Sequence, residues 1–231
     1  MDMESNTKHL RKLFIICWFG EFPDWLNKWV ANMEYLKPMG YDYLIISSLK
    51  LFEQRVREKL NIEPCIVEGS GKPWDYRGSL GLLFEEELKG YDYWGTTDFD
   101  CVYGDIEKYM TDEELVKWDI WSNHHNYICG PWTLYKNIEK INTLFMECED
   151  WQERLEEPQA TGWIEKSYSD MVDRLHHEGE INRLYTHNQS RDPNMWKDLS
   201  FIDGKLYDAG TEIMTFHFNR FKIYPLKEGE V

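Results

Sequence analysis

The sequence predicts one α/β domain with a mixed, mainly parallel central sheet flanked by helices. Residues 13–19 form a continuously apolar run that ends at Gly20, which is the pattern of a strand buried on both faces. Helical and strand patterns then alternate along the first hundred residues, and a β-α-β order implies parallel pairing. A chain of 231 residues is long enough for one such domain.

The first helix is expected after Pro23, because apolar residues recur at helical spacing until Pro38. Strands are expected at residues 41–46 and 64–67, with a charged surface helix at 52–60 between them. These elements continue the β-α-β order of the amino-terminal part.

A strand at residues 91–95 is expected after a helix at about 80–88 that Gly90 ends. This strand leads into the segment 96–100, which reads TTDFD and therefore places two acids at the carboxyl end of a strand. Ligands of open α/β sheets bind outside that edge.

The second half of the chain predicts three helices that begin near residues 111, 138 and 163. The last element is a strand at 213–219, whose alternation aims His217 away from the most apolar side. Neither an internal repeat nor a linker interrupts this order.

The composition indicates a folded protein with little attraction for polyanions. Hydrophobic residues make up 42% and aromatic residues 16% of the chain, which is enough to form a core. The formal net charge of -16 argues against nonspecific binding of nucleic acid. A local basic cluster in a cleft can still hold a diphosphate, because close pairs are weakly screened.

The five cysteines are odd in number and contain no CxxC pair, so neither a disulfide framework nor a zinc site is expected. No stretch has the length of a membrane span, and the polar start lacks the apolar region of a signal peptide. These features predict a cytoplasmic protein without a membrane span, located in the host cytoplasm if the source is viral.

Asp98 and Asp100 are the strongest candidates for chemistry. In an extended segment their carboxylates point to the same side, while Phe99 points into the sheet. Mg²⁺ and Mn²⁺ prefer oxygen ligands and often keep substrate phosphates in their coordination shell. One or two carboxylates together with a diphosphate are therefore enough to bind such an ion. The alternative is a chance pair in an acidic surface loop, since a lone D-x-D is a weak motif.

Several segments together carry a family resemblance. They are WFGEFP at 18–23, KPWDYR at 72–77, GYDYWG at 90–95 leading into DFD, and FHFN at 216–219. Their order and spacing resemble a little-characterised group of small bacterial and viral GT-A glycosyltransferases. The resemblance implies a single GT-A domain over 1–231, with a nucleotide-binding half at about 12–105 and an acceptor half at about 106–231 that ends in a metal-ligand strand.

The resemblance also implies site roles at the end of the first strand and around the D-x-D. In such enzymes the strand end, here Phe19 and Gly20, holds the nucleotide base, and the D-x-D with its central Phe99 holds ribose and metal. Asp100 is then the direct ligand of Mn²⁺ or Mg²⁺, and Asp98 contacts the ribose or a metal-bound water.

His217 is the third ligand that the resemblance implies. A neutral imidazole is an ordinary ligand for Mn²⁺, but a hydrogen-bonded histidine on a strand is the alternative. Asn219, after this histidine, stands where relatives tend to carry Gln, and Trp74 also departs from their pattern.

Four basic residues are candidates for the diphosphate, and two of them, Arg220 and Lys222, follow the late histidine closely. The guanidinium of Arg77 offers a planar fork to phosphate or to a carboxylate such as Asp75. Lys72 lies in a glycine-rich stretch. The alternatives are a surface loop with a helix start for Arg77 and Lys72, and solvated basic residues for the other two.

An inverting transferase needs a carboxylate that takes the proton of the acceptor hydroxyl. Asp170 is the candidate, because it matches the position of an acidic motif in related enzymes. Glu165 and Asp173 compete with it, and a charged residue on an exposed helix face is the alternative interpretation.

Two histidine doublets, His124 with His125 and His176 with His177, do not form chelates, because adjacent residues point apart on strands and diverge on helices. They are expected at polar surface or loop positions. Residues 130–133 can form a wall for the sugar or the acceptor, since aromatic faces suit the apolar side of a sugar ring.

The predicted function is metal-dependent transfer of a sugar from a nucleotide-diphosphate sugar, with UDP favoured, to a carbohydrate or glycoconjugate hydroxyl. One alternative is a metal-dependent nucleotidyltransferase or phosphohydrolase, because paired acids with a metal serve phosphoryl chemistry equally well. The other is a noncatalytic glycan-binding protein, suggested by the 11 tryptophans.

Overall fold

A six-stranded sheet forms the middle layer of the computed structural model, which describes residues 9–190 and 199–218. Its strands are β1 (Lys12–Cys17), β2 (Tyr41–Ile46), β3 (Tyr93–Thr97), β5 (Ile120–Ser122), β6 (Trp132–Lys136) and β7 (Arg183–Tyr185). Their order is β2-β1-β3-β6-β5-β7, and β6 alone runs against its neighbours. The sheet is therefore mixed and mainly parallel, as predicted.

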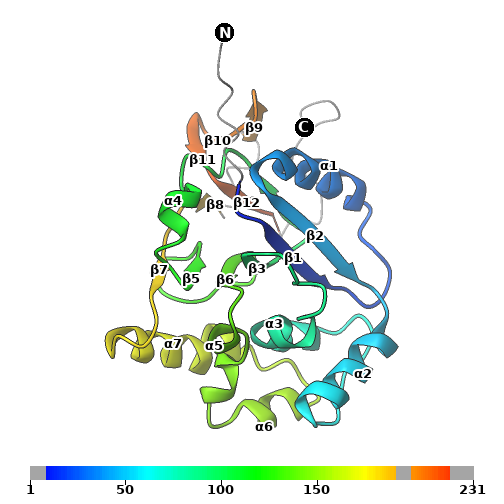
Figure 1. The fold of residues 1–231 in the computed structure, drawn as a ribbon. Coiled ribbons are helices and arrows are strands. Elements are labelled where there is room, and N and C mark those ends of the chain that lie inside the picture. The colour runs from blue at the N-terminus through cyan, green and yellow to red at the C-terminus, as the bar shows by residue number, and fades with distance from the viewer. Residues whose placement is uncertain (1–8, 191–198, 219–231) are drawn as a thin grey trace.

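Helices cover both faces of this sheet (Figure 1). The α-helices are α1 (Leu26–Leu36), α2 (Leu49–Leu60), α3 (Leu80–Leu83), α4 (Asp112–Leu115), α5 (Glu139–Asn142), α6 (Trp151–Glu156) and α7 (Ser167–His177). The 3₁₀ helices are η1 (Lys37–Met39), η2 (Lys72–Ser79), η3 (Leu144–Glu147) and η4 (Trp163–Glu165). α1 lies on one face, and α2, α3, α5, α6 and α7 lie on the other.

The side chains of β1 explain this layering, because successive residues of a strand point to opposite faces. Phe14 packs in one core cluster with Trp29 of α1, and Ile15 packs in another with Phe52 of α2. All four are at most 1% exposed. The continuously apolar run in the sequence therefore reflects a strand that contributes to two cores.

Two small sheets lie beside α1 at one end of the molecule (Figure 1). One contains β4 (Cys101–Tyr103), β12 (Thr215–His217) and β8 (Gln189–Ser190), in the order β4-β12-β8. The other contains β9 (Leu199–Ile202), β10 (Lys205–Asp208) and β11 (Thr211–Ile213). The single late strand that the sequence predicted is thus divided between β11 and β12, which belong to different sheets.

Most predicted elements of the first half are present, and β2 has the predicted bounds. The predicted cap of α4 is also present, since the Thr111 side chain accepts a hydrogen bond from Glu114 N. The predicted strand at 64–67 is wrong, because this segment is irregular. Segment 64–67 ends in a turn where Gly69 N donates a hydrogen bond to Phe19 O at 2.8 Å. The turn therefore lies next to the residues that follow β1, but the segment does not join the sheet.

Two predicted helices are shorter than their apolar patterns. The pattern at 80–88 contains only the four residues of α3, followed by turns, and the pattern at 138–148 divides into α5 and η3. Buried apolar residues in successive turns repeat at nearly helical spacing. The apolar pattern alone therefore does not distinguish a continuous helix from a series of turns. Within the described residues, no helix is long and apolar enough to cross a membrane.

Candidate functional site

The DFD segment follows β3 at the carboxyl edge of the sheet. Phe99 is 2% exposed, and its ring lies 4.9 Å from that of Trp29, centroid to centroid. Trp25 Nε1 donates a hydrogen bond to Phe99 O at 2.9 Å. The side chains of Asp98 and Asp100 are 21% and 23% exposed. Burial of Phe99 therefore fixes the segment and leaves the two carboxylates accessible.

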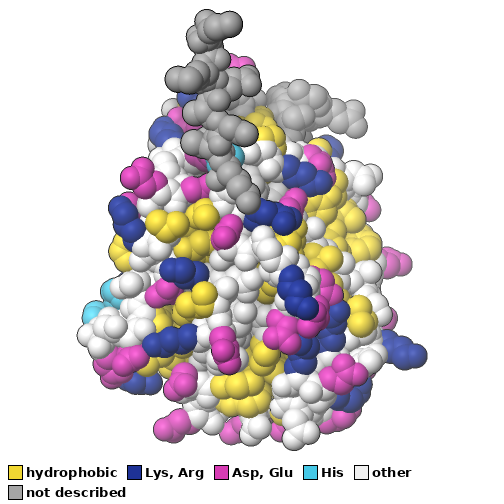
Figure 2. Space-filling model, in the orientation of Figure 1, with side chains coloured by type: hydrophobic (Ala, Val, Ile, Leu, Met, Phe, Trp, Pro, Cys, Tyr) yellow, Lys and Arg dark blue, Asp and Glu magenta, His cyan; other side chains and the backbone are white. Residues whose placement is uncertain are grey.

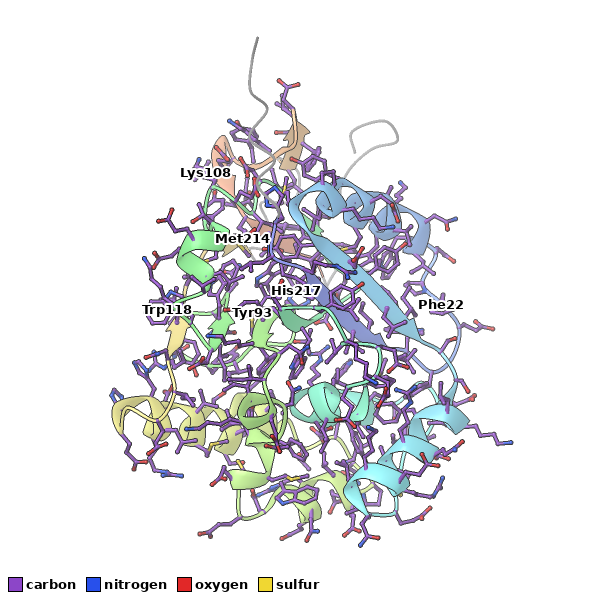
Figure 3. The ribbon with its side chains drawn as sticks, viewed as in Figure 1. Phe22, Tyr93, Lys108, Trp118, Met214 and His217 are labelled. Atoms are coloured by element: carbon purple, nitrogen blue, oxygen red, sulfur yellow. The ribbon has the colours of Figure 1, made fainter. Side chains whose placement is uncertain are left out.

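The pairing of β12 with β4 brings His217 to this segment. The two strands are antiparallel, and His217 lies opposite Cys101 in the register. Phe218 N donates to Asp100 O at 2.9 Å, and the distance between His217 Nε2 and Asp100 Oδ1 is 3.2 Å. Figure 3 shows His217 in the interior of the molecule, whereas Phe22 lies near its rim.

Asp98 has a different partner, the guanidinium of Arg77. Arg77 belongs to η2, and its Nη2 forms a hydrogen-bonded ion pair with Asp98 Oδ1. The guanidinium lies directly against Gly130, where a Cβ would overlap its Nη1 atom. Asp98 and Arg77 were both predicted to contact the nucleotide sugar, and in the structure they also contact each other.

One group of potential metal ligands is present among the described residues. Ligand atoms of Asp100, Cys101 and His217 all lie within 4.8 Å of one another. Burial raises the pKa of the Cys101 thiol well above its ordinary value, and the nearby acids Asp100 and Asp98 raise it further. Asp100 supplies a carboxylate to this group and His217 an imidazole, and both of these side chains also line a cavity.

Asp100 and His217 line a cavity of about 410 Å³. Arg77, Asp98, Asp100 and His217 all contribute to its wall. Glu165 and Tyr127 also line this cavity. The cavity thus gathers acids, a guanidinium, an imidazole and a phenol at the carboxyl edge of the sheet, where such folds bind ligands.

A second cavity of about 130 Å³ adjoins the first, and Trp18 and Trp74 line both. Phe19 and Gly20 line the second cavity, as expected for a site at the end of the first strand. Gly20 has a φ of 132°, a conformation that favours glycine. Trp74 is 55% exposed. The two indoles flank the passage between the cavities.

Cys17 also lines both cavities. Burial raises the pKa of its thiol, and the positive charge of Arg77 opposes this shift. A neutral thiol therefore lies at the junction of the two cavities, within the field of the guanidinium.

Lys72 lies away from both cavities, contrary to expectation. Its side chain is fully buried and its ammonium donates to Asp75 Oδ2 at 3.1 Å and to the Arg154 carbonyl oxygen at 2.5 Å. The Asp75 carboxylate also accepts from Thr161 N at 2.8 Å and from Gly162 N at 3.0 Å. Lys72 therefore fixes the loop before η4 and does not reach a ligand in the cavity.

Asp170 is exposed on α7 and does not line either cavity. Glu165, which the sequence left as a competitor, lines the larger cavity at the end of η4. Its carboxylate has neither a hydrogen bond nor an ion pair to any described residue. Arg220 and Lys222 lie outside the described residues.

Tyr127 was not singled out as a site residue, and its nearest signal was its position just before the predicted acceptor wall at 130–133. Pro131 of that wall lines the larger cavity, whereas Trp132 and Thr133 belong to β6 and are buried. The wall is therefore shorter than predicted, and Tyr127 extends it.

Comparisons with known proteins identify a family and a fold. The family model described as "Family of unknown function (DUF6625)" matches residues 43–230. No curated protein matches the chain. A solved structure described as "crystal structure of a glycosyltransferase involved in the glycosylation of the major capsid of PBCV-1" is similar, with a TM-score of 0.55 and 13% identity, over 92% of this chain and 95% of that chain. At this identity the similarity shows a shared fold, and it matches the predicted class.

Proposed function

Because the chain belongs to the family of unknown function DUF6625, we propose its activity from its fold and its cavity: transfer of a sugar from a nucleoside-diphosphate sugar to a hydroxyl acceptor. The observation that carries the proposal is the approach of His217 to Asp100, with 3.2 Å between Nε2 and Oδ1, beside the Arg77 guanidinium in one cavity.

The residues present fit a divalent cation. A carboxylate oxygen and a neutral imidazole suit Mn²⁺, and Mg²⁺ is commonly held by one or two protein ligands together with substrate phosphates. Asp100 and His217 would hold the ion. When bound, it would offset the charge that develops on the departing diphosphate. Asp98 is engaged by Arg77, so we assign it to the ribose or to a metal-bound water.

Arg77 is placed to bind the diphosphate. A guanidinium has five donors, and the ion pair with Asp98 uses the donors on one side of the fork. The side chain remains 16% exposed and lines the cavity. Asp98 thus orients the guanidinium, and the remaining donors are available to phosphate oxygens.

The smaller cavity is the proposed site of the nucleobase. It continues from the larger cavity past Trp18 and Trp74, and its wall includes Phe19 and Gly20. Flat indole faces suit the faces of a base.

Glu165 is the proposed general base. It lines the same cavity as Asp100, His217 and Tyr127, and its carboxylate is not paired with any described residue. A carboxylate there accepts the proton of an acceptor hydroxyl as the oxygen attacks the anomeric carbon of the donor. We therefore assign this role to Glu165 in place of Asp170.

Thermal unfolding with a panel of nucleoside diphosphates tests the donor site. A ligand at a hundred times its Kd stabilises a protein by about 2.7 kcal/mol. We expect UDP with MgCl₂ to raise the Tm, and Asp100→Asn and His217→Ala to abolish the rise. Asp150→Asn is the control, because Asp150 lines neither cavity. A Tm unaffected by every nucleotide and metal combination would contradict the proposal.

Product analysis separates sugar transfer from phosphoryl chemistry at the same residues. Transfer of a sugar releases a nucleoside diphosphate, whereas a nucleotidyltransferase releases pyrophosphate. Incubation with a panel of nucleotide sugars and Mn²⁺ should therefore release the nucleoside diphosphate.

A further inference from the structure

We propose that a histidine shelf, formed by His124, His125, His187 and Tyr127, binds the saccharide ring of the acceptor. The inference rests on the proposed function, because it assigns the acceptor side of the same cavity. The four rings are contributed by two loops that are about sixty residues apart in the sequence.

The loops meet because the strands before them are neighbours. β5 and β7 are parallel, and Ser122 pairs with Tyr185 at their ends. β5 runs in the same direction as β3, so both loops emerge at the edge of the sheet that carries the DFD segment. Tyr127 lines the larger cavity together with Glu165, and it is the inner end of the shelf.

The rings form a continuous stack that leads outward from the cavity. The centroid of His124 lies 3.5 Å from that of Tyr127 and 4.5 Å from that of His125, with interplanar angles of 28° and 29°. The ring of His187 stands against that of His125 at 5.1 Å and 82°. His124 is 7% exposed, whereas His125 and His187 are exposed.

Hydrogen bonds hold the two loops together. Asn123 Oδ1 accepts from Thr186 Oγ1 at 3.2 Å and from Asn188 N at 2.9 Å. Thr186 N donates to Ser122 O at 3.0 Å, and Asn188 O accepts from Met214 N at 2.9 Å. The shelf is therefore fixed to β5 and to the residue that precedes β12, the strand that carries His217.

The chemistry of the shelf suits a sugar ring. The imidazole rings of His125 and His187 are exposed, so they can offer a face to the apolar C–H side of a pyranose and N–H edges to its hydroxyl groups. A metal is a poorer occupant, because no three residues of the shelf are among the described groups with ligand atoms within 4.8 Å.

The position of the shelf relative to the donor identifies the occupant as the acceptor. The nucleotide half of the donor is assigned to the smaller cavity and to Arg77, next to Trp18 and Trp74. The shelf begins at Tyr127, which lines the same cavity as the proposed base Glu165. A ring on the shelf would present its hydroxyl to this carboxylate.

Saturation-transfer NMR with a panel of methyl glycosides, in the presence of UDP and MgCl₂, tests the shelf on the full chain. We expect the ring protons of at least one glycoside to receive saturation. The double variant His125→Ala, His187→Ala should raise the Kd of that glycoside about tenfold, as expected for loss of about 1.4 kcal/mol of stacking and hydrogen bonding. His177→Ala, an exposed histidine on α7, is the matched control.

Two outcomes overturn the inference: no methyl glycoside receives saturation, or the double variant binds it as tightly as the His177→Ala control does. Release of nucleoside diphosphate from nucleotide sugars is measured in parallel on the wild-type chain. If that release is absent while the glycoside binds in a histidine-dependent manner, the proposed function fails and the shelf stands as a saccharide site. If release occurs without glycoside binding, the shelf fails alone.

Discussion

Glu165 and Asp170 are five residues apart, yet only Glu165 lines the cavity. Removal of a general base typically lowers a rate by a factor of about 10² to 10⁴. We expect Glu165→Gln to lower kcat for sugar transfer by at least about 10²-fold, because the amide cannot accept the proton. Steady-state kinetics with a nucleotide sugar and an acceptor measures this change.

Asp170→Asn is the matched comparison, since this carboxylate is exposed on α7. It should retain kcat within about twofold, as expected for a surface substitution away from the reacting groups. The reverse result, a large loss in Asp170→Asn and none in Glu165→Gln, would return the role of base to Asp170.

Gly130 controls the position of Arg77. Its φ is outside the left-handed region, so alanine is compatible with the backbone, but the added Cβ would overlap Arg77 Nη1. We expect Gly130→Ala to displace the guanidinium and to reduce stabilisation by UDP and MgCl₂, at a folding cost of about 1–3 kcal/mol from overpacking.

Thermal shift with the nucleotide, together with urea unfolding without it, separates these two effects of Gly130→Ala. A variant that loses stability but keeps the full nucleotide shift would show that Arg77 does not contact the diphosphate.

The sequence identified Asp98, Asp100, Arg77 and His217 as site candidates, but it did not predict how they pair. The alternation of DFD indicated that both carboxylates face one side. The choice of Arg77 as the partner of Asp98 depends on Gly130, which lies beyond β5 in the chain and admits the guanidinium because it lacks a Cβ. Such a contact is decided by packing, so no local pattern reveals it.

At the scale of elements, Asp75 connects η2 to η4. Its carboxylate binds Lys72 Nζ, Thr161 N and Gly162 N, and its carbonyl oxygen accepts from Trp163 Nε1 at 2.8 Å. η2 carries Arg77 and η4 ends at Glu165, so one buried side chain sets the distance between the proposed phosphate ligand and the proposed base.

We expect Asp75→Asn to destabilise the fold by about 3–5 kcal/mol, because it leaves the fully buried ammonium of Lys72 without its counter-charge. Urea unfolding measures the change. Asp150→Asn is the control, since its pair with Arg154 is partly exposed and should cost less than about 1 kcal/mol. Equal losses in the two variants would contradict a structural role for the buried pair.

Elements of the first half were predictable because local patterns determine them. β1 is apolar on both faces, and α2 carries buried residues at 52, 56 and 60, as a helix with one buried face requires. β4 and β12 have three residues each, and they pair across more than a hundred positions. The alternation at 213–219 predicted a strand that includes β12, but no strand was predicted at β4, so the pairing of the two was not predicted.

At the scale of the molecule, the predicted class of fold is confirmed by the sheet topology and by the similarity to a solved structure over 92% of this chain. The chain has a formal net charge of -16. On the face in Figure 2, acidic and basic side chains are interspersed and form no extended patch of one sign. The groups suited to a diphosphate are instead inside a cavity, which a count of charges does not reveal.

The position of β12 near the end of the described chain has a consequence for biosynthesis. A ribosome makes Asp100 long before His217, and the amino-terminal strands and helices can collapse while the later residues are still inside the exit tunnel. The imidazole reaches its carboxylate only when β12 aligns with β4. A nascent chain released before that point would bury most of its sheet without forming the contact between His217 and Asp100.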